Sequence, residues 1–176
     1  QRYFDNSLDY DSPEALRLST AVRQAGITAV VGVSERSGSS LYMGQWIIGA
    51  DGRTIAARRK LRPTHVERAV FGEGDGSDLA VHQVEGLGRI GALCCWEHLQ
   101  PLSKYAMYAQ NEQVHVAAWP SFSNYEPFAP ALGSEVNNAA SRIYAVEGSC
   151  FVLAPCAVVS KAMIDELCDT PEKREL

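Results

Sequence analysis

An apolar strand that leads directly into a helix-like segment constrains the fold of this chain more than any other feature. Residues 88–94 are small and apolar, a pattern typical of a buried strand. Residues 96–109 instead repeat apolar side chains at helical spacing, namely Leu99, Leu102 and Met107. Cys94 and Cys95 lie at the junction, and open α/β sheets place their chemistry at this end of a strand. Free amides at the helix start would favour a thiolate, so Cys95 is the first candidate for a nucleophile.

The remaining pattern alternates strands with amphipathic helices and predicts an α/β fold, with helices covering the sheets, in one domain over residues 1–176. Ser12-Pro13-Glu14 is typical of a helix start, and Gly26 ends that helix. Its buried face is predicted to comprise Ala15, Leu16, Leu18, Ala21 and Val22. The β-branched run at 27–33 predicts a strand buried on both sides.

Further elements follow from the same two patterns. An Asp51-Gly52 turn predicts a hairpin. The predicted elements are hairpin strands at 41–48 and 54–58, paired strands at 79–84 and 88–94, a strand at 114–119, a helix at 132–147 and a strand at 151–154. The apolar stripe of the helix at 132–147 is predicted to be Val136, Ala139, Ala140, Ile143 and Val146.

Charge and cysteine content exclude several classes of partner. The net charge is −5 with no basic block, which argues against nucleic acid and anionic membranes as partners. No apolar run has the length of a membrane span, and no signal peptide opens the chain. Five cysteines, an odd number, favour a reducing cytoplasm over a disulfide framework. Cys94-Cys95 with His98 lacks the spacing of common zinc sites, so no metal is expected.

A long charged loop at residues 59–76 interrupts the pattern, and such loops usually serve a site. It carries Lys60 and Glu67. An ammonium near Cys95 would favour the thiolate, and a carboxylate could shuttle protons. Spacing alone leaves the alternatives open, in which Lys60 is a solvated cation and Glu67 a surface ion-pair partner.

Several segments together carry a specific pattern. They are Arg58-Arg59-Lys60-Leu61-Arg62-Pro63-Thr64-His65-Val66-Glu67-Arg68, Phe71-Gly72-Glu73-Gly74-Asp75-Gly76, Cys95-Trp96-Glu97-His98 with Gln100-Pro101-Leu102, and residues 113–120 and 141–148. In this order and without large gaps, they resemble the nitrilases of the carbon–nitrogen hydrolase superfamily. The likeness covers essentially the whole chain.

The resemblance implies roles for individual residues. Cys95 would be the nucleophile, and Lys60 with the backbone amide of Trp96 would stabilise charge on the substrate nitrogen and the tetrahedral intermediate. Glu67 would hold Lys60 and help position substrate or water. The general-base glutamate of the family would lie upstream of Gln1, and Glu35 belongs to a different segment and does not replace it.

The resemblance also implies a fold and a reaction. The fold would be an α-β-β-α sandwich, here incomplete at both ends, that pairs across helices into a homo-oligomer, either a dimer or a spiral. The helix after Cys95 would contribute to the pairing surface. The reaction would convert a small-molecule nitrile to a carboxylic acid and ammonia through a cysteine thioimidate, without a cofactor. The alternatives are an amidase or carbamoylase, or a catalytically silent oligomer-forming subunit.

Two groups of residues are candidates for the substrate pocket. Glu97 and His98 would belong to a site wall, or would cap the first turn of the helix. The aromatic side chains that follow strand 114–119 would line the pocket or pack in the core: Trp119, Phe122, Tyr125 and Phe128. His65 and His115 are expected to be structural, and Cys94 to be a small buried side chain.

Overall fold

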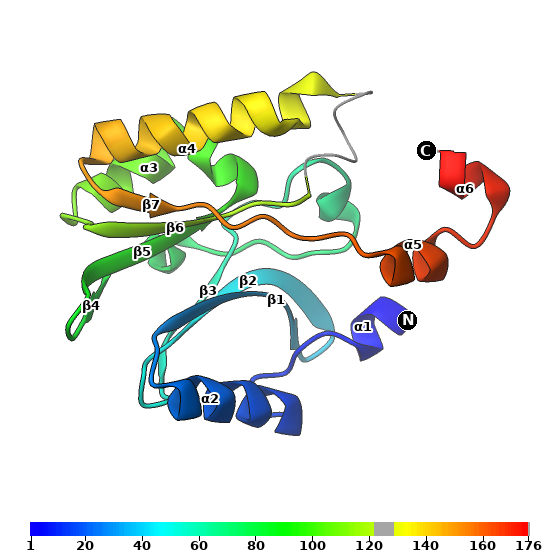
Figure 1. The fold of residues 1–176 in the computed structure, drawn as a ribbon, viewed down its shortest axis with the longest axis horizontal. Coiled ribbons are helices and arrows are strands. Elements are labelled where there is room, and N and C mark those ends of the chain that lie inside the picture. Colours follow the sequence, from blue (N-terminus) through cyan, green and yellow to red (C-terminus); the bar gives the residue numbers. More distant parts are fainter. Residues whose placement is uncertain (122–128, 176) are drawn as a thin grey trace.

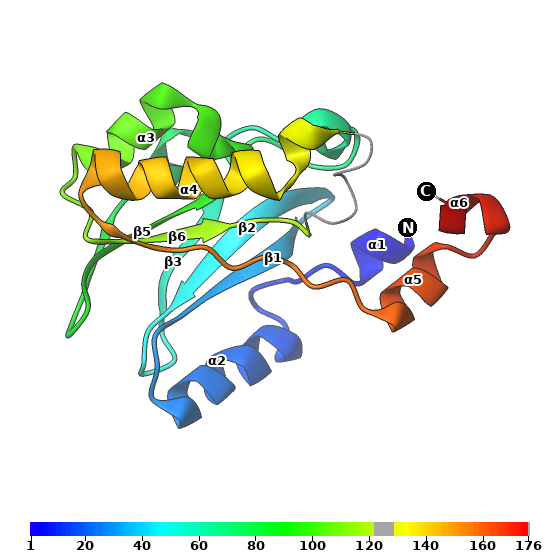
Figure 2. The same ribbon diagram turned by 45° about the horizontal axis from the view of Figure 1, so that its top comes forward.

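The structure, a computed structural model, describes residues 1–121 and 129–175. Two sheets face each other, and helices cover their outer faces (Figure 1). Helix α2 (Pro13–Ala25) covers one sheet, and helices α3 (Pro101–Tyr108) and α4 (Ser134–Gly148) lie side by side on the other (Figure 2). The predicted α-β-β-α sandwich is confirmed.

The first sheet is an antiparallel meander of β1 (Ala29–Ser37), β2 (Ser40–Ile48) and β3 (Thr54–Arg59). The predicted hairpin between β2 and β3 is confirmed. Asp51 Oδ1 accepts a hydrogen bond from the Arg53 amide at 2.9 Å and closes the turn locally.

Helix α2 begins and ends where the sequence predicts. The Ser12 hydroxyl accepts a hydrogen bond from the Ala15 amide, and Gly26 ends the helix with a left-handed φ of 64°. Ala15 and Val22, two turns apart, pack with Trp46 of the sheet. The prediction of a wider buried face on α2 was wrong, because within residues 1–121 and 129–175 the helix packs against one sheet and against no other helix. The residues left exposed are Leu16, Leu18 and Ala21.

The second sheet has the order β4-β5-β6-β7, with β4 antiparallel to β5 and the other pairs parallel. Its strands are β4 (His82–Val84), β5 (Gly88–Cys94), β6 (Val114–Ala118) and β7 (Phe151–Leu153). Leu93, Met107 and Tyr144 are buried between this sheet and its two helices.

The segment after β5 is not the continuous helix predicted at 96–109. A 3-10 helix, η3 (Cys95–Leu99), is followed by Gln100 in extended conformation, and α3 begins after it. The break arises because the residue before a proline disfavours helical backbone angles. Met107 is buried as predicted, whereas Leu99 and Leu102 are exposed.

Helix α4 buries a different face from the one its apolar residues predict. Its buried side chains are Asn137, Ala140, Ser141 and Tyr144, whereas Val136, Ala139, Ile143 and Val146 are exposed. Ser141 tolerates burial because its Oγ accepts from the Trp119 indole at 2.9 Å and donates to the Asn137 carbonyl at 3.1 Å. Together with Leu102 and Tyr105 of α3, the exposed apolar residues of α4 give the two helices an apolar outer surface.

Strand β1 is only half-buried, which corrects the prediction of burial on both sides. A cavity of about 640 Å³ lies between the sheets, with Val30, Ile90, Val116 and Leu153 in its lining. Val30 therefore faces the opposite sheet across this cavity and is not in close contact with it.

Short elements complete the described residues. They are α1 (Arg2–Asp5), η1 (His65–Ala69), η2 (Gly76–Asp78), η4 (Pro130–Leu132), α5 (Lys161–Leu167) and α6 (Pro171–Glu175). Figure 1 shows α5 and α6 beyond the sandwich, on the side where α1 lies. Across residues 1–121 and 129–175, no helix combines the length and apolar character needed to cross a membrane.

Candidate active site

Cys95 occupies a sharp turn at the carboxyl end of β5. Its backbone has a φ of 51°, a left-handed conformation that is uncommon for a side chain other than glycine. The Trp96 amide donates a hydrogen bond to the Cys95 sulfur. The turn is held from below by Ala117 and Trp119, which pack against Cys95 and Trp96. Local strain thus presents the thiol at the end of the strand.

A cavity of about 380 Å³ opens beside this thiol. Residues from both halves of the chain line it, including Tyr3, Met43, Glu67, Phe71, Cys95 and Trp119. Trp119 is therefore in the place proposed for a pocket residue, whereas Glu97 and His98 are not in the lining. Phe122, Tyr125 and Phe128 lie outside the described residues.

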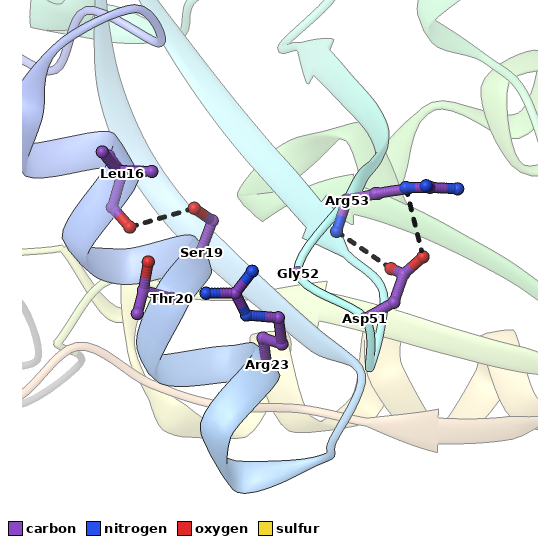
Figure 3. Close-up of a pocket in the computed structure, with 7 residues that line it drawn as sticks. All are labelled: Leu16, Ser19, Thr20, Arg23, Asp51, Gly52 and Arg53. Atoms are coloured by element: carbon purple, nitrogen blue, oxygen red, sulfur yellow. Dashed lines mark hydrogen bonds and ion pairs between the residues drawn. The ribbon is translucent and has the colours of Figure 1, made fainter.

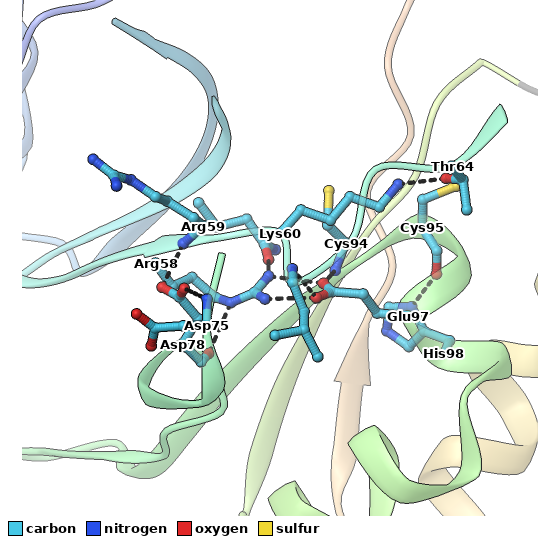
Figure 4. A network of polar contacts seen from close by, with 12 residues as sticks. Arg58, Arg59, Lys60, Thr64, Asp75, Asp78, Cys94, Cys95, Glu97 and His98 are labelled. Atoms are coloured by element: carbon cyan, nitrogen blue, oxygen red, sulfur yellow. Dashed lines mark hydrogen bonds and ion pairs between the residues drawn. The ribbon is translucent and has the colours of Figure 1, made fainter. Parts of the chain in front are cut away.

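Lys60 directly follows β3, and its ammonium forms hydrogen bonds with side chains of the loop that carries Glu67. Lys60 Nζ donates to Glu67 Oε2 at 2.6 Å and to Thr64 Oγ1 at 2.7 Å. The Thr64 amide donates to the same Glu67 oxygen at 2.6 Å. Figure 4 shows the Lys60 side chain extended toward Thr64. Sequence reasoning missed Thr64, although Thr64-Xaa-Xaa-Glu67 is the pattern of a capping box, which the structure contains.

The electrostatic environment of Cys95 differs from the one expected. Burial raises the pKa of the thiol, and the positive charge of Lys60 and the Trp96 hydrogen bond lower it only in part. The expectation of a thiolate favoured by nearby amides and a lysine therefore underestimated desolvation. The resting group is the thiol, and an attack on substrate must include removal of its proton. Burial also raises the pKa of the neighbouring Cys94 to about 12.

The Glu97 carboxylate joins the two segments that carry Lys60 and Cys95. It is 4% exposed and receives a bidentate pair of hydrogen bonds from Arg58, at 2.8 and 2.9 Å. Its oxygens also accept from the amide of Leu61 at 2.8 Å and from the amide of Cys94 at 2.7 Å (Figure 4). These amides belong to the residue after Lys60 and the residue before Cys95. Glu97 thus clamps the two segments together.

Arg58 extends this clamp into the layer between the sheets. It is 5% exposed and donates to Gln45 Oε1 at 2.7 Å and to the Asp78 carbonyl at 3.1 Å. Sequence reasoning did not single out Arg58, because nothing local marks it as the partner of a residue 39 positions away.

His98 and His115 belong to a second buried network beneath Cys95. His98 Nδ1 lies 2.6 Å from the Cys95 carbonyl oxygen, and His98 Nε2 lies 2.9 Å from His115 Nε2. His115 Nδ1 in turn lies 2.7 Å from Glu112 Oε1, and the Tyr144 hydroxyl donates to Glu112 Oε2 at 2.6 Å. Burial lowers the pKa of each histidine to about 3 and raises the pKa of Glu112 to about 7.

Glu35 forms a separate buried ion pair. Its two oxygens accept from Arg59 at 2.9 and 2.5 Å, and the Arg59 guanidinium stacks on the Tyr42 ring at 3.7 Å. Both carboxylate oxygens are therefore engaged, which leaves Glu35 poorly suited to act as a base.

A further cavity, of about 430 Å³, lies between α2 and the β2–β3 turn (Figure 3). Ser19 donates its hydroxyl proton to the Leu16 carbonyl, and Arg53 pairs with Asp51. Its lining residues thus offer no activated nucleophile, and the Cys95 cavity remains the candidate site. Within residues 1–121 and 129–175, no three His, Cys, Asp or Glu side chains gather as a metal site requires.

Comparison of the sequence with known proteins identifies a family and several similar proteins. Residues 1–173 match the family model described as carbon–nitrogen hydrolase. The chain is 62% identical over its full length to a nitrilase of Pseudomonas syringae pv. syringae, and it covers 52% of that protein. It is 57% identical over 94% of its length to "Nitrilase, arylacetone-specific" of Alcaligenes faecalis, of which it covers 46%. An aliphatic nitrilase of Rhodococcus rhodochrous is 53% identical over 99% of the chain and is covered to 48%. The chain spans about half the length of the curated relatives it matches.

Solved structures share the fold. A carbon–nitrogen hydrolase of Helicobacter pylori superposes with a TM-score of 0.73 at 17% identity, over 91% of this chain and 56% of that one. A member of the same superfamily from Xanthomonas campestris gives a TM-score of 0.68 at 18% identity, over 90% of this chain and 58% of that one. At these identities the likeness concerns the fold alone.

Proposed function

This chain belongs to the carbon–nitrogen hydrolase family, and from that premise we propose that the full-length protein is a nitrilase that converts an organic nitrile to its carboxylic acid and ammonia. The observation that carries the proposal is the convergence at one cavity of the Cys95 thiol and of Glu67, which holds the buried ammonium of Lys60. A thiol, a fixed cation and a backbone amide are the groups that nucleophilic attack on a polar C–N bond requires.

The proposed reaction begins with the thiol of Cys95. Its sulfur attacks the nitrile carbon, and the proton displaced from the thiol ends on the nitrile nitrogen, which gives a thioimidate. Negative charge develops on that nitrogen during the attack. The positive charge of the Lys60 ammonium and a hydrogen bond from the Trp96 N–H would stabilise it. Because burial raises the pKa of the thiol, the proton transfer accompanies the attack.

The second half of the proposed reaction returns the enzyme to its starting state. Water adds to the thioimidate carbon and ammonia leaves, so that a thioester remains on Cys95. A second water molecule hydrolyses the thioester to the acid and frees the thiol. Glu67, hydrogen-bonded to both Thr64 and Lys60, is the carboxylate in the cavity that would orient this water.

The test is an assay of the full-length protein with aliphatic, aromatic and arylacetonitrile substrates and the matching amides, in which ammonia, acid and amide are each quantified. We expect turnover of a nitrile and a covalent adduct on Cys95 by intact mass. Cys95→Ala should abolish both, and Lys60→Met should lower kcat by roughly 100- to 1000-fold through loss of one electrostatic donor. Ammonia from amides but not from nitriles would instead indicate an amidase. The absence of both turnover and the covalent adduct would refute the proposal.

A homo-oligomer is part of the same proposal. The outer surface of α3 and α4 supports it, because Leu102, Tyr105, Ile143 and Val146 are each about half-exposed or more. Exposed apolar side chains gathered on two neighbouring helices are typical of an interface. Sedimentation velocity of the full-length protein tests this, and a monomer at all concentrations would contradict it.

We also propose a cytoplasmic location, which the odd number of five cysteines supports.

A further inference from the structure

The proposed mechanism does not use the buried chain of side chains beneath Cys95. We infer that Glu112, acting through His115 and His98, is a positioning residue for the peptide unit between Cys95 and Trp96, and that it performs this role in its protonated form. The catalytic role of Glu112 rests on the proposed function. The protonation states assigned to Glu112, His115 and His98 do not depend on it.

The hydrogen-bonded chain is continuous, and its three side chains are buried. It runs from the Cys95 carbonyl through His98 and His115 to Glu112, with links of 2.6, 2.9 and 2.7 Å. Glu112 is 5% exposed, and both histidines are 1% exposed or less. Because these side chains are removed from bulk water, their hydrogen bonds are satisfied within the hydrogen-bonded chain.

The Cys95 carbonyl at one end determines which atom carries the proton in each hydrogen bond of this chain. A carbonyl oxygen can only accept, so His98 carries its proton on Nδ1 and presents an unprotonated Nε2. His115 must then donate from Nε2, which leaves its Nδ1 as the acceptor when the ring is neutral. The remaining link is complete only if Glu112 donates a proton to His115. The other Glu112 oxygen accepts from the Tyr144 hydroxyl, so it does not compete for this role.

The surroundings favour this neutral arrangement over an ion pair between His115 and Glu112. Burial raises the pKa of Glu112 by more than the hydrogen bonds from Tyr144 and the Gly91 amide lower it, and burial lowers the pKa of both histidines. Arg58 lowers the pKa of His115 by more than Glu97 raises it, whereas for His98 the raising effect of Glu97 is the larger of the two. The ionisable groups that face Glu112 and the two histidines from neighbouring elements are Arg58, Glu97, Tyr108, Tyr144 and Cys150.

The functional consequence follows from the geometry of one peptide unit. The Cys95 carbonyl and the Trp96 N–H belong to the same planar group, so a hydrogen bond on the carbonyl fixes the direction of the amide. That amide donates to the Cys95 sulfur and is the proposed donor to the developing anion. The bond from His98 also polarises the amide and strengthens it as a donor.

Loss of the proton from Glu112 breaks this arrangement. The carboxylate would draw the His115 proton to Nδ1, and two unprotonated Nε2 atoms would then face each other at 2.9 Å. His98 relieves the repulsion only by moving its own proton to Nε2, which removes the bond to the Cys95 carbonyl. Activity should therefore fall on the alkaline side as Glu112 ionises.

Glu112→Gln tests the inference in the full-length protein, because the glutamine amide donates to His115 and its oxygen still accepts from Tyr144. We expect kcat within about threefold of wild type near pH 6, an unchanged KM, and an alkaline limb moved upward by at least one pH unit. Glu14→Gln, the same change on exposed α2, should leave the profile unchanged. A loss of more than tenfold at every pH in Glu112→Gln, or an unshifted alkaline limb, would overturn the inference.

A second measurement does not depend on turnover. In ¹⁵N-histidine-labelled protein near pH 6, we expect the Nδ1–H tautomer for His98 and the Nε2–H tautomer for His115. The Trp96 amide resonance should move with pH in wild type and not in Glu112→Gln. A doubly protonated His115 would refute the assigned protonation states even if the protein hydrolyses nitriles. The expected tautomers in a protein without nitrilase activity would refute the proposed function alone.

Discussion

Replacement of the carboxylate that clamps the two active-site segments should destabilise the fold severely. In Glu97→Gln, one of the two oxygens becomes an NH₂ group of nearly the same size. Oε1 accepts from Arg58 and the Leu61 amide, and Oε2 accepts from Arg58 and the Cys94 amide. Either orientation of the glutamine therefore leaves one guanidinium N–H and one backbone N–H facing another donor.

The expected magnitude follows from these two losses. A hydrogen bond to a charged group contributes roughly 1.5–3 kcal/mol, and a buried donor without a partner costs about 1–3 kcal/mol. The sum agrees with the roughly 3–5 kcal/mol lost when one partner of a buried ion pair is removed. Both side chains are 5% exposed or less, so solvent screening does not reduce this figure. For a chain of 176 residues, we expect Tm to fall by about 10 °C.

The assay is urea unfolding followed by circular dichroism, with Glu14→Gln as the control. Glu14 pairs with Arg17 on the exposed face of α2, and such pairs contribute about 0–1 kcal/mol. An apolar double variant, Arg58→Met with Glu97→Met, should not restore stability, because the Leu61 and Cys94 amides both lack acceptors and Gln45 and the Asp78 carbonyl lose their donor. A Glu97→Gln variant within 1 kcal/mol of wild type, or a double variant as stable as wild type, would refute the reasoning.

Two further predictions concern Thr64 and the buried histidines. Thr64→Val removes the hydroxyl that bridges Lys60 and Glu67, and we expect kcat in the full-length protein to fall about tenfold, close to the contribution of one hydrogen bond, with recovery in Thr64→Ser. Because folding lowers the pKa of His98 and His115 below the ordinary value of 6.5, the stability that these two neutral rings contribute is complete above that pH and declines as pH falls from 6.5 toward 3. Burial raises the pKa of Glu112 to about 7, so in wild type its protonation adds stability as pH falls and opposes this decline. Urea midpoints of the Glu112→Gln variant at pH 7, 5 and 4 measure the histidine decline without this opposition, and a midpoint that stays constant across the series would contradict buried neutral histidines.

The sequence by itself determined those elements whose defining hydrogen bonds and backbone angles lie within a few neighbouring residues. The Ser12 cap, the Gly26 end of α2 and the Asp51 turn each depend on hydrogen bonds or backbone angles inside one short segment. The strand at 88–94 was predicted from its own run of small apolar residues, whereas a continuous helix was expected where the turn at Cys95 and η3 follow it.

Only the tertiary structure decided which faces are buried and which charges meet. Helix α4 turns Tyr144 to the core and leaves Ile143 and Val146 exposed, and the partner of the Tyr144 hydroxyl, Glu112, lies outside the helix. Glu97 and Arg58 are 39 positions apart, and no local pattern specifies that pair. Desolvation is likewise a property of the assembled core: it raises the pKa of Cys95, whereas the sequence by itself pointed to a thiolate.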